Sequence, residues 1–201
     1  MSGAFEAPPS LEKRAGADER PYIIRTYDRW IILVLVIVGG WLLFRPLIAF
    51  TVYYRGLGFE RVFRLSDAEY YYQKATRVDP KVPQGWQGWG ELEYQRAPSD
   101  PTARRTAIDV FSKGLAFNPR YAPLAFDLGR TYFLDKQYVK ARDAFLASAK
   151  INPNDMFTWD YAAWSSLHAG EPELARKYWH EVLRIDPGNA TAARELAKLS
   201  G

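Results

Sequence analysis

Four prolines that recur at a nearly constant interval constrain this chain more than any other feature of its sequence. They stand at 80, 119, 153 and 187, in the strings VDPK, FNPR, INPN and IDPG, spaced by 39, 34 and 34 residues. Each proline is preceded by the same pattern, which we call the ladder. It consists of a small residue, an aromatic residue four positions after it, and a residue seven positions after it that is small in most units. The ladder residues are Ala68, Tyr72 and Ala75; Ala107, Phe111 and Gly114; Ala141, Phe145 and Ser148; and Ala175, Trp179 and Val182. This self-similarity indicates a repeat protein whose units stack on their neighbours.

The unit resembles the tetratricopeptide repeat (TPR), which has two antiparallel helices in about 34 residues. The first-helix signature is most complete at Leu128, Gly129 and Tyr132. Partial matches are Trp86, Trp89 and Gly90 with a displaced Tyr94, and Trp159, Ala162 and Ala163 with Ser166 at the tyrosine position. The resemblance covers residues 66–201. It implies an all-α fold: a solenoid of about three repeats, a preceding half-repeat and a C-terminal capping helix.

Helix ends follow from local chemistry, because proline terminates a helix and small residues let paired helices approach closely. We expect a capping box at Ser66 and Glu69, and an Asp100 cap followed by Pro101. Segment 51–62 is a candidate partner for the first repeat helix, with Gly56 at its glycine position. The predicted helices span 66–79, 83–95, 101–117, 122–134, 137–151, 156–168, 171–185 and 189–199.

An apolar segment precedes the repeats. Trp30 to Phe44 contains no charge, and apolar character continues past Arg45 and Pro46 to Tyr54. Residues 30–50 as a helix measure about 31 Å, which is enough to cross the hydrocarbon layer of a bilayer. We therefore predict a flexible polar tail over 1–29, one transmembrane helix over 30–54, a connector over 55–65 and a TPR domain over 66–201.

Arg45 allows two interpretations. Its guanidinium either snorkels to the headgroups or makes an intramembrane contact with an acidic group of a partner helix. Arginines flank the apolar segment equally on both sides, so the positive-inside rule does not fix orientation. The architecture resembles bacterial inner-membrane repeat proteins and, less closely, mitochondrial import receptors. The usual behaviour of uncleaved anchors favours a cytoplasmic N-terminal tail, with the repeats on the far, periplasmic side.

The sequence offers little for catalysis. There is no cysteine, and His168 and His180 lie on different predicted helices without carboxylates at metal-ligand spacing. Residues 65–201 carry eighteen Lys and Arg against seventeen Asp and Glu, which gives no basic stripe for nucleic acid. We expect no enzyme activity, no metal, no cofactor and no nucleic acid partner.

The resemblance implies a partner-binding groove lined by the first helix of each repeat. The corresponding residues are Gln87, Glu91, Tyr94, Phe126, Arg130, Phe133, Phe157, Asp160 and Trp164. The family's Lys and Asn clamp for acidic chaperone tails is not present at these positions. The groove suits an extended segment or amphipathic helix with apolar anchors, with Arg130 available to an acidic residue, although some of these aromatic residues equally fit packing between repeats.

Two functions fit this architecture. One is a membrane-anchored scaffold or adaptor that assembles or organises a membrane protein complex. The alternative is a permanent structural subunit of such a complex, in contact with its transmembrane helices and with the lipid bilayer. Arg45 and the Gly39–Gly40 pair favour lateral helix contacts and support the second.

Overall fold

The structure, a computed structural model, describes residues 22–199, and all secondary structure in this part of the chain is helical. The described chain divides between Leu43 and Phe44 into two units. The helices are α1 (Tyr22–Arg61), α2 (Leu65–Val78), α3 (Pro83–Arg96), α4 (Pro101–Phe117), α5 (Ala122–Leu134), α6 (Tyr138–Ile151), α7 (Met156–His168), α8 (Pro172–Ile185) and α9 (Ala190–Lys198).

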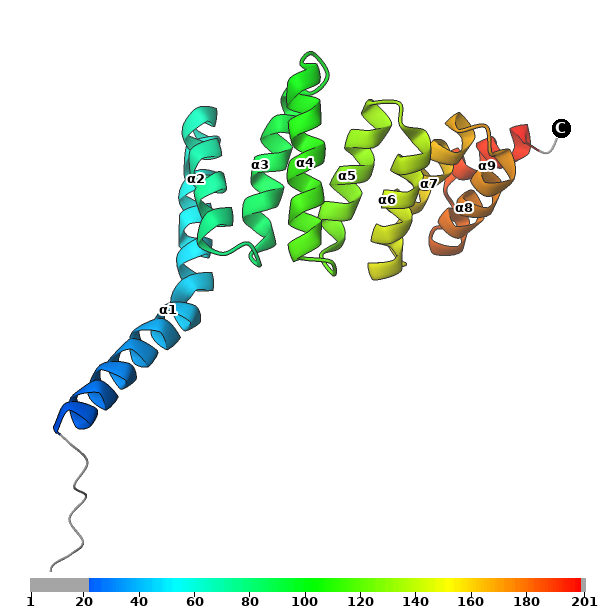
Figure 1. Cartoon of the computed structure of the whole chain (residues 1–201). Coiled ribbons are helices and arrows are strands. Elements are labelled where there is room, and N and C mark those ends of the chain that lie inside the picture. The colour runs from blue at the N-terminus through cyan, green and yellow to red at the C-terminus, as the bar shows by residue number, and fades with distance from the viewer. Residues whose placement is uncertain (1–21, 200–201) are drawn as a thin grey trace, which may run out of the picture. The chain divides into compact units, whose positions relative to one another are not determined.

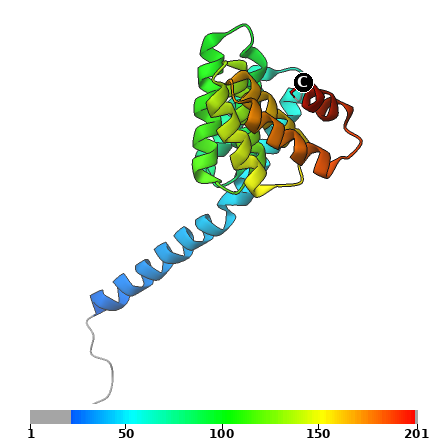
Figure 2. The ribbon, with the colours of Figure 1, turned by 90° about the vertical axis from the view of Figure 1, so that its right-hand side faces the viewer.

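In the second unit, antiparallel helix hairpins stack side by side into a solenoid, as both ribbon views show (Figures 1 and 2). The eight predicted repeat helices all exist, and each end lies within one residue of its predicted position. Asp100 caps α4 as expected, because its carboxylate accepts a hydrogen bond from the Thr102 N–H at 2.7 Å. The predicted capping box is wrong: α2 begins at Leu65, which places Ser66 inside the helix, and no side chain caps it.

The C-terminal end of α1 completes the first repeat, so the predicted half-repeat is a full helix pair. Tyr53 and Phe59 of α1 pack on the cluster formed by Ala68, Tyr72 and Leu92. Gly56 is needed for this contact, since a Cβ at this position would stand 2.8 Å from the Tyr72 ring. The predicted first-helix role of segment 51–62 is therefore confirmed.

The repeating ladder forms the core of the solenoid. Its aromatic members Tyr72, Phe111, Phe145 and Trp179 are at most 1% exposed, and the small residues four positions before them are fully buried. In three repeats the aromatic ring lies against a glycine of the preceding helix; Phe145, for example, would stand 2.7 Å from a Cβ on Gly129. The sequence period is thus a packing period, in which each large side chain fills the space left by a small one.

The first unit is the N-terminal part of α1. A stretch from Tyr27 to Arg61 is long enough to cross a membrane, and its most apolar 18-residue window has a mean hydropathy of 2.5 and no buried residue. The helix begins at Tyr22, before the predicted span, and it continues to Arg61 through most of the predicted connector. The predicted flexible tail lies largely outside the described residues.

Helix α1 continues past Tyr54 because its residues beyond Phe44 pack against the repeats. Ala49 is fully buried, and the division between the two units falls between Leu43 and Phe44. Ala49 and Tyr53 therefore contribute to the solenoid core, whereas Leu47 and Tyr54 stay exposed.

Candidate functional site

The nine groove residues predicted from the sequence lie on α3, α5 and α7, the first helices of successive repeats. These helices touch one another across the hairpins, with α5 in contact with both α3 and α7. Prolines at the first turns of α3 and α5 help to fix where these helices start. The helices therefore present their side chains on one common face of the solenoid, which we call the A face.

A hydrogen-bonded charged cluster joins α3 to α5 on the A face. Arg130 Nη1 lies 3.1 Å from Asp127 Oδ1 and 3.4 Å from Glu91 Oε2. The guanidinium also stands over the Tyr94 ring, 4.2 Å from its centroid. Gln87 Nε2 donates to Asp127 Oδ2 at 3.3 Å. Arg130 Nη1 is thus already engaged within the chain, which leaves less of the guanidinium for an acidic ligand than the sequence predicted.

This cluster carries more carboxylate than cation. Burial raises the pKa of Asp127 above its ordinary value, and the nearby Arg130 guanidinium opposes that rise. Burial likewise raises the pKa of Glu91, which shares the same guanidinium. One arginine therefore faces two partly desolvated carboxylates, and an additional cation placed here would be attracted to both of them.

The predicted groove residues Phe126 and Phe133 of α5 pack mainly against the neighbouring helices α6 and α7. Phe126 meets Phe145 edge-on at 5.5 Å between ring centroids and meets Tyr161 at 5.6 Å. Phe133 contacts Tyr138 and His168 in the same way. Both rings are half-buried, and they hold α5 against α6 and α7.

Of the three predicted groove residues on α7, Phe157 is exposed, whereas Asp160 and Trp164 contact α8. Phe157 is 63% exposed and is the most accessible aromatic side chain of the predicted set. Asp160 accepts a hydrogen bond from the Trp179 indole at 3.0 Å, and burial raises its pKa. Trp164 packs edge-on against Trp179, with ring centroids 5.3 Å apart.

Two residues that hydrogen-bond within the cluster, Asp127 and Tyr121, were not predicted from the sequence. Asp127 follows Phe126 directly and so falls outside the positions that the family pattern assigns to a groove. Tyr121 precedes α5, and its hydroxyl donates to Gln87 Oε1 at 2.8 Å. A signal was present, because an aspartate three residues before an arginine on one predicted helix indicates an ion pair.

Arg45 has a partner within its own chain. Its Nη2 lies 3.1 Å from Asp79 Oδ1, in the loop between α2 and α3. Asp79 is only 5% exposed and also accepts from the Lys81 N–H. The sequence predicted a headgroup or an acidic group of a partner helix as the contact of this guanidinium, and Asp79 of the same chain was not expected.

Among the residues that the structure describes, no group of three His, Asp or Glu side chains is arranged to hold a metal ion. The A face instead offers a half-buried charged cluster at one end and exposed aromatic surface at the other, which suits recognition of a polypeptide segment.

The architecture is that of a TPR-like helical solenoid, and solved structures agree. The chain is similar to the first TPR of Spaghetti (RPAP3) bound to an HSP90 peptide (21% identity, TM-score 0.54, covering 61% of this chain and 93% of that one). It is also similar to MamA, with 20% identity and a TM-score of 0.60 over 71% of this chain and 75% of that one. A third similar structure is Pseudomonas aeruginosa pilF, with 21% identity and a TM-score of 0.61 over 77% of this chain and 68% of that one. At these identities the likeness concerns the fold.

Sequence comparison adds a distant relative. The peroxisomal targeting signal receptor of Candida glabrata is 25% identical over 120 residues, which cover 60% of this chain and 20% of that protein. The chain thus spans about a fifth of the length of this curated relative. No family model matches the sequence.

Proposed function

We propose that this protein is a membrane-anchored interaction scaffold that binds a segment of a partner protein on the A face, in the assembly or organisation of a membrane protein complex. The observation that carries the proposal is the charged cluster of Glu91, Asp127 and Arg130, in which two half-desolvated carboxylates share one guanidinium. Similar folds provide context, since two solved TPR domains of RPAP3 hold HSP90 and HSP70 peptides.

The chemistry of the A face defines the partner segment. A Lys or Arg side chain of the partner would complete the charge balance at Glu91 and Asp127. An apolar side chain would cover Phe157, about two hairpins along the solenoid at the other end of the face. The ligand is therefore an extended segment or an amphipathic helix that carries a cation and an apolar anchor.

The anchor in this proposal is the first unit of the chain. Residues 22–43 form 22 residues of continuous helix, about 33 Å in length, with Arg25, Asp28 and Arg29 confined to its first turns. The uncharged stretch 30–44 measures about 22 Å, and the exposed Leu47 and Ile48 extend the apolar surface to about 28 Å, close to the thickness of the hydrocarbon layer. We place the repeats on the periplasmic side of a bacterial inner membrane, following the usual behaviour of uncleaved anchors.

Peptide binding to the full-length protein in detergent tests the A face. We expect peptides with a Lys or Arg and an apolar residue to bind, and Glu91→Gln and Phe157→Ala each to weaken binding by about tenfold. Val139→Ala is the matched control, because Val139 is an exposed apolar residue of α6 outside the A face. Equal binding by all three variants would contradict the proposal.

A permanent structural subunit is the second candidate. It is favoured by Gly39 and Gly40, where a Cβ would meet nothing within 4 Å, so another transmembrane helix has room to approach closely. Purification in mild detergent separates the two functions. A fixed stoichiometry that survives high salt indicates a subunit, and a substoichiometric, salt-labile association indicates a scaffold.

A further inference from the structure

The loops that connect successive repeats all lie along one edge of the solenoid. These are residues 79–82, 118–121 and 152–155, and Figure 1 shows them at the same ends of their hairpins. The Asn118 side chain ties two of them together by donating to the Pro80 carbonyl at 2.9 Å. We call this the proximal edge, because its residue Asp79 binds Arg45, which directly follows the first residue of the unit.

The proximal edge carries cations without carboxylate partners. The side chains of Arg77, Lys81, Arg120 and Lys150 are exposed, and within the described chain none of them makes an ion pair. The two carboxylates of the three loops are already engaged. Asp79 is bound by Arg45, and Asp155 accepts hydrogen bonds at the start of α7.

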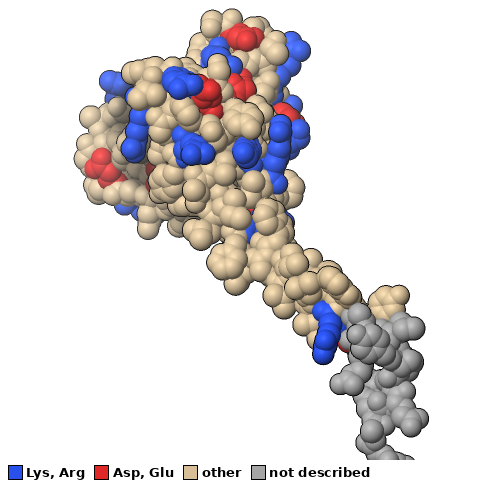
Figure 3. All heavy atoms as spheres, turned by 90° about the vertical axis from the view of Figure 1, so that its left-hand side faces the viewer, with Lys and Arg blue, Asp and Glu red and all other residues tan. Residues whose placement is uncertain are grey.

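The opposite edge balances much of its charge locally. Arg64 pairs with Asp67 at 2.8 Å, Arg104 pairs with Asp135 at 3.1 Å, and Arg142 pairs with Glu171. At the α1–α2 end of the solenoid, Lys and Arg side chains are more prominent than Asp and Glu in the space-filling view (Figure 3). The unpaired cations of the proximal edge are therefore a local feature that calls for an anionic partner.

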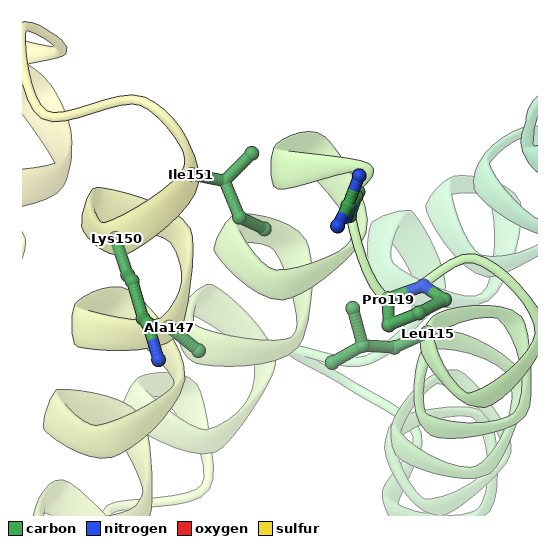
Figure 4. A pocket seen from close by; sticks show the side chains of 6 residues that line it. Leu115, Pro119, Ala147, Lys150 and Ile151 are labelled. Carbon is green, nitrogen blue, oxygen red and sulfur yellow. The ribbon is translucent and has the colours of Figure 1, made fainter.

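A hollow on this edge lies between two of these cations. It has a volume of about 560 Å³ and is lined by Leu115 and Pro119 on one side and by Ala147, Lys150 and Ile151 on the other (Figure 4). Arg120 completes the lining. The hollow thus combines an apolar floor with two cationic groups, as the glycerol and phosphate region of a phospholipid requires.

We propose that the proximal edge rests on an anionic bilayer surface and that the hollow between Arg120 and Lys150 receives an anionic phospholipid. Connectivity supports this occupant, because Arg45 on this edge directly follows the uncharged stretch 30–44 of the proposed anchor. Exposed apolar side chains support it too: Phe117 is 50% exposed, and Ile151 is exposed beside Lys150. The inference rests on the proposed membrane anchor and is independent of the proposed peptide binding.

The absence of cysteine makes a direct test practical. Asn154→Cys gives a unique labelling site on the proximal edge, and Ser99→Cys gives one on the opposite edge; both positions are exposed. The full chain is placed in nanodiscs of phosphatidylcholine with or without phosphatidylglycerol. Energy transfer from the labelled cysteine to headgroup-labelled lipid then reports how closely each edge approaches the bilayer.

We expect phosphatidylglycerol to increase transfer from the Asn154→Cys label much more than from the Ser99→Cys label. The pair Arg120→Glu and Lys150→Glu should remove the increase, because each cation near an anionic surface contributes about fivefold in affinity. Arg105→Glu with Lys136→Glu makes the same charge change on the opposite edge and should have no effect. If circular dichroism shows that the Glu pair disturbs folding, Arg120→Gln with Lys150→Gln replaces it, with a smaller loss expected.

Native mass spectrometry of the detergent-solubilised protein tests the hollow itself. A retained phosphatidylglycerol molecule should be seen with the wild type and the control pair, and should be lost with Arg120→Glu and Lys150→Glu. Equal transfer in the two kinds of nanodisc, or equal lipid retention by all variants, would overturn the inference while leaving the anchor intact. A chain that does not enter nanodiscs at all contradicts the anchor and this inference together.

Discussion

Arg45 Nη2 and Asp79 Oδ1 lie 3.1 Å apart, which joins the part of α1 just beyond Leu43 to the loop between α2 and α3. The carboxylate is almost entirely buried, whereas the guanidinium keeps about a quarter of its surface exposed. The pair therefore fixes α1 to the first repeat at the point where the solenoid unit begins.

We predict that Arg45 and Asp79 are energetically coupled. Arg45→Ala leaves a buried carboxylate without its cation and should lower the free energy of unfolding by about 1–3 kcal/mol. Adding Asp79→Ala should cost less than the sum of the two single changes, with a coupling of at least about 1 kcal/mol. Urea unfolding in mild detergent, followed by tryptophan fluorescence, measures all four proteins. Strictly additive effects would show that the contact is not energetically significant.

Two glycines should respond oppositely to the same substitution. A Cβ on Gly90 would collide with the Phe111 ring, so Gly90→Ala should destabilise the protein by about 1–3 kcal/mol. Gly58 lies in α1 with nothing within 4 Å of a Cβ, so Gly58→Ala should gain up to about 1 kcal/mol from helix propensity. Thermal unfolding of both variants checks the pair, and a loss at Gly58 as large as that at Gly90 would contradict the packing described above.

The pH dependence of stability should reveal the charged cluster on the A face. Because the pKa of Glu91 is raised in the folded state, its contribution to stability is complete below its ordinary value of 4.5 and is lost as pH rises through the raised pKa. Glu91→Gln cannot titrate, so its free energy of unfolding relative to wild type should increase over the same pH range and then level off. Parallel urea titrations at several pH values measure the difference, and a constant difference would show that Glu91 is not desolvated.

Acidic chaperone-tail peptides should bind poorly. The RPAP3 domains hold peptides that end in EEVD, whereas the A face of this chain places Glu91 and Asp127 around a single engaged arginine. We expect affinity for SRMEEVD at least about tenfold below that for a matched peptide with Lys replacing both glutamates, because like charges repel in a partly desolvated site. Fluorescence anisotropy measures both peptides. A preference for the acidic peptide would show that the charge assigned to the A face is wrong.

The repeat helices were predictable because their determinants are local. A proline just after the last turn prevents a helix from continuing, and the spacing from Ala141 to Phe145 to Ser148 places all three on one helix face, whatever that face meets. A period repeated four times also makes coincidence improbable, so the bounds and the buried aromatic ladder follow from the sequence.

The site was less predictable, because it depends on which side chains meet across helices. Phe126 and Phe157 were both predicted to line the groove, yet Phe126 packs against Phe145 and Tyr161 while Phe157 stays exposed. The partners of Arg130 include Glu91, which lies 39 residues away in the chain. The same is true of Arg45, whose apolar surroundings suggested lipid until a carboxylate 34 residues away was found beside it.

By itself, the sequence determined that this protein is a helical repeat preceded by a long apolar helix, since helix ends and amphipathic faces arise from interactions within a few residues. Only the tertiary structure decided where that apolar helix joins the solenoid, which cations remain unpaired and which aromatic rings stay exposed. Those properties arise when hairpins distant in the chain come into contact, because burial and charge pairing belong to the assembled surface and not to any single segment.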